Sequence, residues 1–483
     1  MINNLRILFI TLTHSGGGGA ETVLTNLVNH LPKTWCIDIL ETTDYAIKKE
    51  AINANIRLLP PLTKNSYKGI DHLIRYVFFY HPKVIKTLRH LYDYDVVVGW
   101  IYQNATFMLP AFGECKKIAW FHGMVDDLLP TSSSTAIDYY QKFKIFRLQK
   151  KACAHSDKIV VISNKTKKSL LRVYPENSNK MEIIYNPVDI KKIIKLSNEA
   201  MDEAELAFLD KLNTTTYPIL ASIGRLDENK NFSLALKAIA ILKQKNIFVN
   251  YLIIGTADIK ELEKLEKLRD ALNLKDRVFF MGFRQNPLRL LKTCKLLLVT
   301  SLEEGFSMVA AEAMALGIPF VTTPVAGASE ELSNNETCGL VADWNEEEYA
   351  DKIELLLKDK ALYAKMSDAC KEHIKNFSIE SSFQSFYKML EAIPKKNIKE
   401  RKKNRVWAFL LFIIYTIYGY IKKTTRQVRV RLNIFKNELS LLNMFNLLFA
   451  FNIFFVSLLS LPLFAIYSGL LAIKNKKKLL GYK

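Results

Sequence analysis

The sequence predicts an α/β protein with two doubly wound parallel-sheet domains and a helical, membrane-associated C-terminal tail. Short apolar runs alternate with amphipathic helical patterns, as in β-α-β units, and this alternation occurs twice within residues 1–394. The chain has 483 residues, 49% of them apolar and 24% charged, which is typical of folded chains with two or three domains. From residue 395 onward, clusters of Lys and Arg instead alternate with uncharged blocks.

The first half is predicted to form a domain over residues 1–188. Its candidate strands are Arg6–Thr11, Cys36–Leu40, Val96–Gly99, Lys117–Phe121, Lys158–Ile162 and Glu182–Tyr185. Between the first two strands, one helical face carries the apolar residues Val23, Leu24, Leu27, Val28 and Leu31. The apolar stretch at the start of the chain is shorter than the core of a signal peptide, so we predict a strand there.

A polar segment from about residue 189 to 217 is expected to join the halves, and the pattern then restarts as a domain over residues 217–376. Its candidate strands are Ile219–Ile223, Asn250–Ile254, Val278–Met281, Lys295–Thr300 and Pro319–Thr322. Its candidate helices are Phe232–Gln244, Ile259–Leu272 and Met308–Leu316. Doubly wound sheets bind ligands beyond the carboxyl ends of their strands, so we expect the functional residues there.

Four consecutive glycines, residues 16–19, follow the first strand and precede the first helix. Glycine is costly to order, which suggests that a backbone without side chains is needed at this point. The free N–H groups and the positive end of a helix dipole suit a phosphate, so Gly17, Gly18 and Gly19 are candidate ligands. The motif matches neither G-x-G-x-x-G nor a P-loop, and a plain turn with Glu21 complementing the dipole is the alternative.

Two cations, Arg225 and Lys230, follow the strand Ile219–Ile223 in the stretch "SIGRLDENKN". At a strand's carboxyl end they suit a diphosphate, Arg as a planar fork and Lys as a point charge. An exposed loop in which Asp227 and Glu228 pair with these cations is the alternative.

The stretch "LEEGFSMVAAEAMALGIP" carries two carboxylates, Glu304 at the predicted end of a strand and Glu312 on the following helix. Eight helical residues span about 12 Å, enough to place one carboxylate at a sugar and the other further along a nucleotide. Alanines surround Glu312, so an acid there needs a partner, and carboxylates bind vicinal hydroxyls well. Gly305 allows close approach of the backbone.

Taken together, these motifs resemble the retaining glycosyltransferases of family 4, which have the GT-B fold of two Rossmann-like domains facing a cleft. The motifs that carry the resemblance are Glu304-x7-Glu312, Arg225 with Lys230, Gly18-Gly19-Ala20-Glu21 and "IYNPVD" at 184–189. The resemblance covers roughly residues 5–394. Within it, residues 377–394 resemble the closing helix that packs back on the first domain.

The resemblance implies a role for each motif. The glycine loop, Arg225 and Lys230 would hold the nucleotide diphosphate from opposite sides of the cleft. Glu312 would bind the ribose and Glu304 the donor sugar, with the amides of Gly305 and Phe306 beside the phosphate. His122, in "AWFHG" at a strand's carboxyl end, would lie near the reaction centre, although a lone histidine can also be structural.

The resemblance also implies metal-independent transfer of a hexose-type sugar, with no cofactor and no protein nucleophile. Arg225, Lys230 and helix N–H groups would stabilise the departing diphosphate, and a diphosphate oxygen would take the acceptor's proton. The sequence also contains an Asp-x-Asp motif, Asp93-Tyr94-Asp95, of the kind that binds metal in another glycosyltransferase type. It precedes a strand, so we expect it at the amino end of the sheet, away from ligands.

The net charge of +20 is concentrated in the tail, because residues 395–483 contain 18 Lys and Arg against two Glu. Uncharged blocks at 406–421 and 439–473 separate the basic clusters, which argues against nucleic acid and for a membrane. The first block has 16 residues, short for a span, so we expect it to lie in the interface. The second is expected to form a re-entrant hairpin; one tilted span, or a soluble helical domain, is the alternative.

Six cysteines without metal-ligand spacing fit a reducing compartment, so we expect the protein on the cytoplasmic face of a membrane. The hypothesis from sequence is transfer of a sugar from a UDP- or GDP-sugar to a lipid-linked glycan. A two-domain nucleotide-sugar epimerase and a catalytically dead membrane-tethered scaffold are the alternatives. The sugar, the nucleotide and the linkage stay open.

Overall fold

A computed structural model describes residues 4–13, 19–43, 52–53, 55–59, 61–62, 94–100, 104–113, 115–126, 136–213 and 217–393. The predicted tail at 395–483, together with Gly17, Gly18 and Asp93, lies outside these residues. Among the helices within these ranges, none has both the length and the apolar character that crossing a membrane requires.

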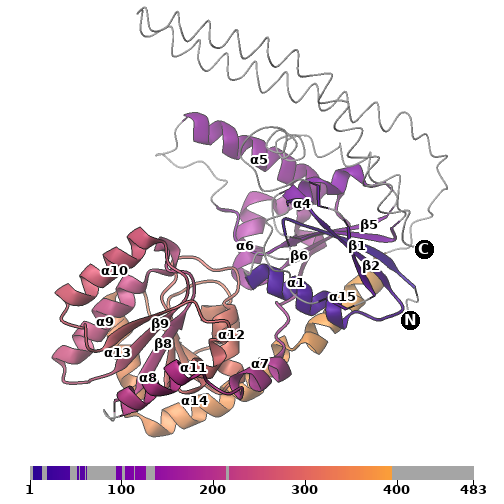
Figure 1. Cartoon of the computed structure of the whole chain (residues 1–483). Helices are drawn as coiled ribbons and strands as arrows, with labels where there is room; N and C mark the ends of the chain where they lie inside the picture. The colour runs from indigo at the N-terminus through magenta and orange to yellow at the C-terminus, as the bar shows by residue number, and fades with distance from the viewer. Residues whose placement is uncertain are drawn as a thin grey trace, which may run out of the picture.

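The first domain is built on seven parallel strands in the order β3-β2-β1-β4-β5-β6-β7 (Figure 1). The strands are β1 (Arg6–Thr11), β2 (Cys36–Glu41), β3 (Ile56–Leu59), β4 (Val96–Trp100), β5 (Lys116–Phe121), β6 (Lys158–Val161) and β7 (Met181–Ile183). The helices are α1 (Gly19–His30), α4 (Asn104–Phe107), α5 (Ala136–His155) and α6 (Asn164–Val173). The strand order reverses between β1 and β4.

The second domain has six parallel strands in the order β10-β9-β8-β11-β12-β13, and its order reverses between β8 and β11. The strands are β8 (Ile219–Ile223), β9 (Asn250–Ile254), β10 (Val278–Gly282), β11 (Leu296–Val299), β12 (Phe320–Thr322) and β13 (Gly339–Val341). The helices are α9 (Phe232–Gln244), α10 (Ile259–Ala271), α11 (Leu288–Lys292), α12 (Met308–Ala315), α13 (Glu346–Lys358) and α14 (Lys360–His373).

The prediction of two doubly wound parallel sheets is confirmed, and β1, β8, β9 and α9 have the predicted bounds at both ends. Every residue predicted on the inner face of α1, from Val23 to Leu31, is buried in the core. Strands β3 (four residues) and β13 (three residues) were not among the predicted strands. The predicted strand Glu182–Tyr185 is observed at Met181–Ile183: it begins one residue earlier and ends two residues earlier, because the chain then leaves the sheet toward the second domain.

The segment expected to be a polar connection contains two helices, α7 (Ile190–Ser197) and α8 (Glu203–Asn213). Both belong to the second domain. The Asn286 side-chain amide donates to the Leu196 carbonyl at 2.8 Å, and Arg289 forms an ion pair of 3.0 Å with the buried Glu205 carboxylate. The segment is amphipathic rather than merely polar, since its few apolar residues pack against the second domain's core.

The chain crosses between the domains twice, and the two crossings lie side by side. The Val188 N–H donates to the Phe377 carbonyl at 2.9 Å, and Val188 pairs with Ser378 in a parallel bridge. Ser382 Oγ donates to the Tyr185 carbonyl at 2.9 Å. The two crossings are therefore hydrogen-bonded to each other at the point where the domains join.

Helix α15 (Ile379–Ala392) follows the second crossing and packs on the first domain, where Figure 1 shows it in orange beside α1 and β2. The Tyr387 ring stacks on Trp35 with centroids 6.1 Å apart, and Lys116 Nζ donates to the Leu390 carbonyl at 2.7 Å. The C-terminal end of the described chain thus covers a first-domain surface to which Trp35, after α1, and Lys116, on β5, both contribute.

Candidate active site

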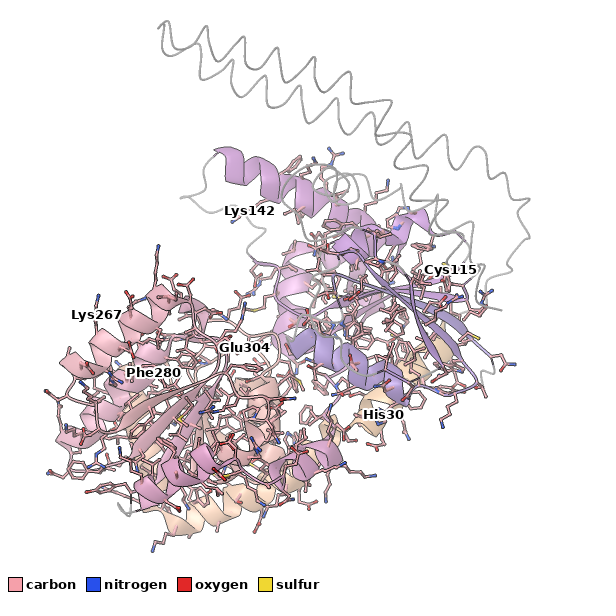
Figure 2. All side chains as sticks on the ribbon, in the orientation of Figure 1. His30, Cys115, Lys142, Lys267, Phe280 and Glu304 are labelled. Carbon is pink, nitrogen blue, oxygen red and sulfur yellow. The ribbon has the colours of Figure 1, made fainter. Side chains whose placement is uncertain are left out.

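The carboxyl ends of β8 and β11, where the second sheet reverses, bring two predicted site residues into contact. Lys230 Nζ lies 2.5 Å from Glu304 Oε1, and the two side chains are only 22% and 14% exposed. They come from turns 74 residues apart in the sequence. Figure 2 shows Glu304 on the side of the second domain that faces the first. The reversal point therefore carries a shielded ion pair rather than two independent charges.

The loop that carries Glu304 differs from the prediction, because β11 ends at Val299 and Glu304 does not close the strand. Five residues of irregular chain extend the backbone past the sheet edge before Gly305. Within that loop, Ser301 Oγ donates to Glu304 Oε1 at 2.8 Å. The carboxylate is thus oriented by its own loop as well as by Lys230.

Arg225 and Lys230 were predicted as a pair, but the structure separates their roles. The Arg225 side chain is 80% exposed, and its guanidinium lies 3.3 Å from the Asp227 carboxylate, as in the exposed-loop alternative. The backbone N–H of Lys230 donates to Asp227 Oδ1 at 3.1 Å, which shapes the turn, while the Lys230 ammonium reaches Glu304. Only Lys230 is therefore joined to the predicted carboxylates.

Gly305 lies directly against the backbone of the first domain. A Cβ built on Gly305 would lie 2.0 Å from the carbonyl oxygen of His122, a distance that real Cβ atoms do not show. The residue must be glycine because another domain's backbone occupies the space of a side chain. This contact places the loop after β11 directly against the end of β5.

His122 follows the last residue of β5 and lies among aromatic rings, 4.4 Å from Trp100 and 6.2 Å from Trp120 between centroids. Its ring nitrogens are buried and have no hydrogen-bond partner among the described residues. Burial lowers the pKa of His122 to about 3, because the charged imidazolium loses its hydration. The ring is therefore neutral at physiological pH, with one donor and one acceptor nitrogen.

Glu312 lies on α12, partly shielded from water. Burial raises the pKa of this carboxyl to about 7, because desolvation outweighs the opposing effect of the Lys192 charge. The first turn of α12 also faces the first domain: a Cβ built on Gly19 would lie 3.7 Å from Met308 Cγ. Of the glycine-loop candidates Gly17, Gly18 and Gly19, the structure describes Gly19, which lies opposite the start of α12.

Phe306, predicted to contribute a backbone amide, has a buried side chain. Its ring packs near Tyr185 and Phe377, with centroids 6.4 and 5.7 Å away. Tyr185 and Phe377 belong to the two interdomain crossings. The loop that follows Glu304 therefore packs directly on the two interdomain crossings.

A second interdomain contact was not predicted. The backbone N–H of Asn164, at the start of α6, donates to Glu331 Oε1 at 2.6 Å, and Lys165 Nζ donates to the Pro324 carbonyl at 2.5 Å. Burial raises the pKa of the Glu331 carboxyl. No sequence signal identifies this contact, because its partners are more than 150 residues apart and belong to different domains.

Of the Asp-x-Asp motif, the structure describes Tyr94 and Asp95, and Asp95 lies at the expected amino end of the sheet. Asp95 precedes β4, at the amino edge of the first sheet, and its carboxylate accepts a hydrogen bond of 2.8 Å from the Arg6 backbone. The neighbouring Tyr94 hydroxyl donates to Asp38. Within the described part of the chain, no three His, Cys, Asp or Glu side chains cluster in a way that could hold a metal ion.

Two doubly wound parallel-sheet domains that face each other are the architecture of the GT-B fold. Family models match most of the chain: "Glycosyltransferase Family 4" matches residues 17–192, and "Glycosyl transferases group 1" matches residues 205–373. The chain therefore belongs to the retaining glycosyltransferases of family 4, the glycosyl transferases group 1.

Among curated relatives, a Campylobacter jejuni N-acetylgalactosamine-N,N'-diacetylbacillosaminyl-diphospho-undecaprenol 4-alpha-N-acetylgalactosaminyltransferase is 29% identical over 237 residues, covering 49% of this chain and 59% of the relative. The Staphylococcus aureus capsular polysaccharide biosynthesis glycosyltransferase CapM is 23% identical, covering 54% of this chain and 67% of the relative. The chain thus spans about three fifths to two thirds of the length of these two relatives.

Solved structures agree on the fold. Anabaena Alr3699/HepE in complex with UDP has a TM-score of 0.61 at 19% identity, covering 80% of this chain and 100% of that chain. WaaG, a glycosyltransferase involved in lipopolysaccharide biosynthesis, has a TM-score of 0.60 at 14% identity, with the same coverage. At these identities the similarity establishes the arrangement of the two domains.

Proposed function

We propose that this protein transfers a sugar, with retention of configuration, from a UDP- or GDP-sugar to a lipid-linked glycan at the cytoplasmic face of a membrane. The observation that carries the proposal is the Lys230–Glu304 pair at the reversal of the second sheet, beside the contact of Gly305 with His122. Ligands of doubly wound sheets bind at that position. A cation and a carboxylate held there match the two parts of a nucleotide-sugar, its diphosphate and its hydroxyls.

Charge development explains how these residues would act. As the bond between sugar and diphosphate breaks, the leaving group gains negative charge, which Lys230, Arg225 and the N–H groups at the start of α12 would stabilise. Glu304 would hold the donor sugar and Glu312 the ribose, while the glycine loop that includes Gly19 approaches the diphosphate from the first domain. The acceptor hydroxyl would pass its proton to a diphosphate oxygen, so the proposal needs neither a protein nucleophile nor a metal.

The acceptor is inferred from the tail and from the relatives. The blocks at 406–421 and 439–473, each next to basic clusters, would hold the protein on an anionic membrane and raise the local concentration of a lipid substrate. The Campylobacter relative's name contains a diphospho-undecaprenol acceptor, and CapM's name refers to capsular polysaccharide. Both support a glycan carried on a membrane lipid.

A donor panel tests this function. Membranes containing the full chain are incubated with radiolabelled UDP- and GDP-sugars, and label is measured in lipid extracts and polymer. We expect one donor to be used, and Glu304→Ala to lower the rate by about 100-fold or more, since a sugar contact made in the transition state is lost. Absence of transfer from every donor would overturn the proposal. If the donor sugar is isomerised when no acceptor is present, the protein is an epimerase. If the Glu312→Ala variant binds nucleotide as tightly as the wild type, the protein is a scaffold.

A further inference from the structure

We propose that Asn229 is a positioning residue for Glu304, acting with Ser301 to hold this carboxylate at the donor sugar. The inference rests on the proposed function, because it assigns what fixes the sugar-binding carboxylate. Neither residue was among the site residues predicted from sequence. Both are hydrogen-bonded to the loop after β11 that carries Glu304, and Asn229 immediately precedes Lys230.

The Asn229 side chain makes a reciprocal pair of hydrogen bonds with the backbone of Glu303. Asn229 Nδ2 donates to the Glu303 carbonyl at 3.0 Å, and the Glu303 N–H donates to Asn229 Oδ1 at 3.1 Å. One orientation of the amide satisfies both bonds, so donor and acceptor are unambiguous. The side-chain amide therefore pairs with the residue before Glu304 as a neighbouring strand would.

This pairing continues where the sheet stops. Strands β8 and β11 pair in register through Leu220–Leu296 and Ala221–Leu297. Beyond them, the Leu302 N–H donates to the Asn229 carbonyl at 2.7 Å, and Thr300 Oγ1 donates to the Lys230 carbonyl at 2.7 Å. Together with the Asn229 amide, these bonds join the Lys230 turn to the Glu304 loop past the sheet edge.

Ser301 fixes the carboxylate itself. Its hydroxyl donates to Glu304 Oε1, the same oxygen that Lys230 contacts. The Ser301 carbonyl is held in turn by Thr323 Oγ1 at 2.6 Å and by Trp344 Nε1 at 3.1 Å. Among the described residues Glu304 Oε2 has no hydrogen-bond partner, so this oxygen is the one available to sugar hydroxyls.

The exposure of Asn229 separates positioning from stability. Its side chain faces water, so in a truncated variant water can replace the lost bonds and the fold should be little affected. Water cannot, however, replace the Asn229 amide in holding the Glu304 loop in one defined position. A displacement of about 1 Å at a reacting group can lower a rate by about 100-fold.

The test is a double-mutant cycle on the full chain, using the donor that the panel selects and its nucleotide diphosphate as probes. Calorimetric Kd values are measured for the wild type, Asn229→Ala, Glu304→Ala and the double variant. We expect Asn229→Ala to weaken donor binding about tenfold and lower kcat further, to leave nucleotide diphosphate binding unchanged, and to add nothing in the Glu304→Ala background. Asn229→Asp, which keeps the acceptor for the Glu303 N–H, should fall between. Glu228→Ala, exposed on the same turn, is the matched control.

The outcomes are distinguishable. Three results would show that the positioning role is wrong while the proposed function stands. Asn229→Ala could weaken the binding of donor and of nucleotide diphosphate equally, or have its full effect also in the Glu304→Ala background. It could also leave both donor binding and kcat unchanged. If the wild type uses no donor at all, the proposed function fails and this inference fails with it. A decrease in Tm of the Asn229→Ala variant that matches its loss of activity would also count against positioning, because it would indicate unfolding.

Discussion

The two faces that the domains present to each other are built differently. On the second domain, Lys230, Glu304, Ser301 and Asn229 form a connected polar network at the ends of β8 and β11. On the first domain, the end of β5 presents His122, whose ring nitrogens have no partner within the described chain and whose neighbours are tryptophans. The end of β8 and β11 is thus polar, whereas the end of β5 is aromatic.

The difference indicates how the two faces would divide the work. Prearranged dipoles and charges stabilise developing charge without reorganising at the moment of reaction, so the second domain suits the nucleotide-sugar. In the proposed function, the aromatic surroundings at the end of β5 would leave the neutral His122 ring to meet a polar group of the substrate. Gly305 brings the loop after β11 against the His122 carbonyl and so places the two faces together.

The largest effect is expected from Gly305→Ala. The Cβ of an alanine at this position would lie 2.0 Å from the His122 carbonyl oxygen. The two domains must therefore move apart to make room for the added methyl group. We expect activity to fall by about 100-fold or more, because the two faces no longer meet. Small-angle scattering should show a larger radius of gyration with unchanged helix content. Gly19→Ala is the matched control for domain spacing, since its methyl would meet only Met308 Cγ at 3.7 Å. Unchanged scattering in both variants would contradict the prediction.

Removing one partner of the Lys230–Glu304 ion pair should lower the free energy of unfolding. Lys230→Ala leaves the Glu304 carboxylate shielded with Ser301 as its remaining donor, so we expect a loss of about 1–3 kcal/mol in the free energy of unfolding. Lys237→Ala is the control: this exposed lysine pairs with Glu346 at 3.3 Å, and its loss should cost under about 1 kcal/mol. Urea unfolding compares the two, and equal losses would show that shielding of the Lys230–Glu304 pair is unimportant.

Glu312 should make stability depend on pH in a defined direction. Its pKa is raised to about 7, whereas an unfolded glutamate titrates near 4.3, so between these values the folded state binds more protons. The contribution of Glu312 is therefore complete below about pH 4 and is lost as pH rises through 7. The free energy of unfolding should therefore fall less between pH 5 and pH 8 in Glu312→Gln than in the wild type, by about 1–3 kcal/mol. Identical pH dependence in wild type and variant would contradict the assignment.

The smallest effect is expected at the second interdomain contact. Glu331→Gln keeps the side-chain oxygen that accepts from the Asn164 N–H but removes the negative charge at the start of α6. A charge at a helix N-terminus is worth about 0.3–1 kcal/mol, so donor KM should rise by about two- to fivefold with kcat nearly unchanged. Glu330→Gln, which alters the longer contact with Lys168 at 3.6 Å, should have less effect. A larger effect for Glu330→Gln would contradict this ranking.

Local patterns in the sequence were sufficient for most of the framework. Short apolar runs predicted β1, β8 and β9 at both ends, because these strands are buried on both faces. A helical period of apolar residues predicted α9 at both ends. The same spacing located Lys230 and His122 at strand ends. It missed α7 and α8, whose partners on α11 lie far along the chain, so their polar surface dominated the local pattern.

The sequence by itself determined the two-sheet framework, the family motifs and the strand ends at which charged residues gather. Only the tertiary structure decided which of those residues meet: Lys230 with Glu304, Asn229 with Glu303, and Gly305 with the His122 carbonyl. The physical reason is range. Periodicity arises from burial over a few neighbouring residues, whereas a hydrogen bond between residues 74 or 167 positions apart depends on how completed strands and domains pack.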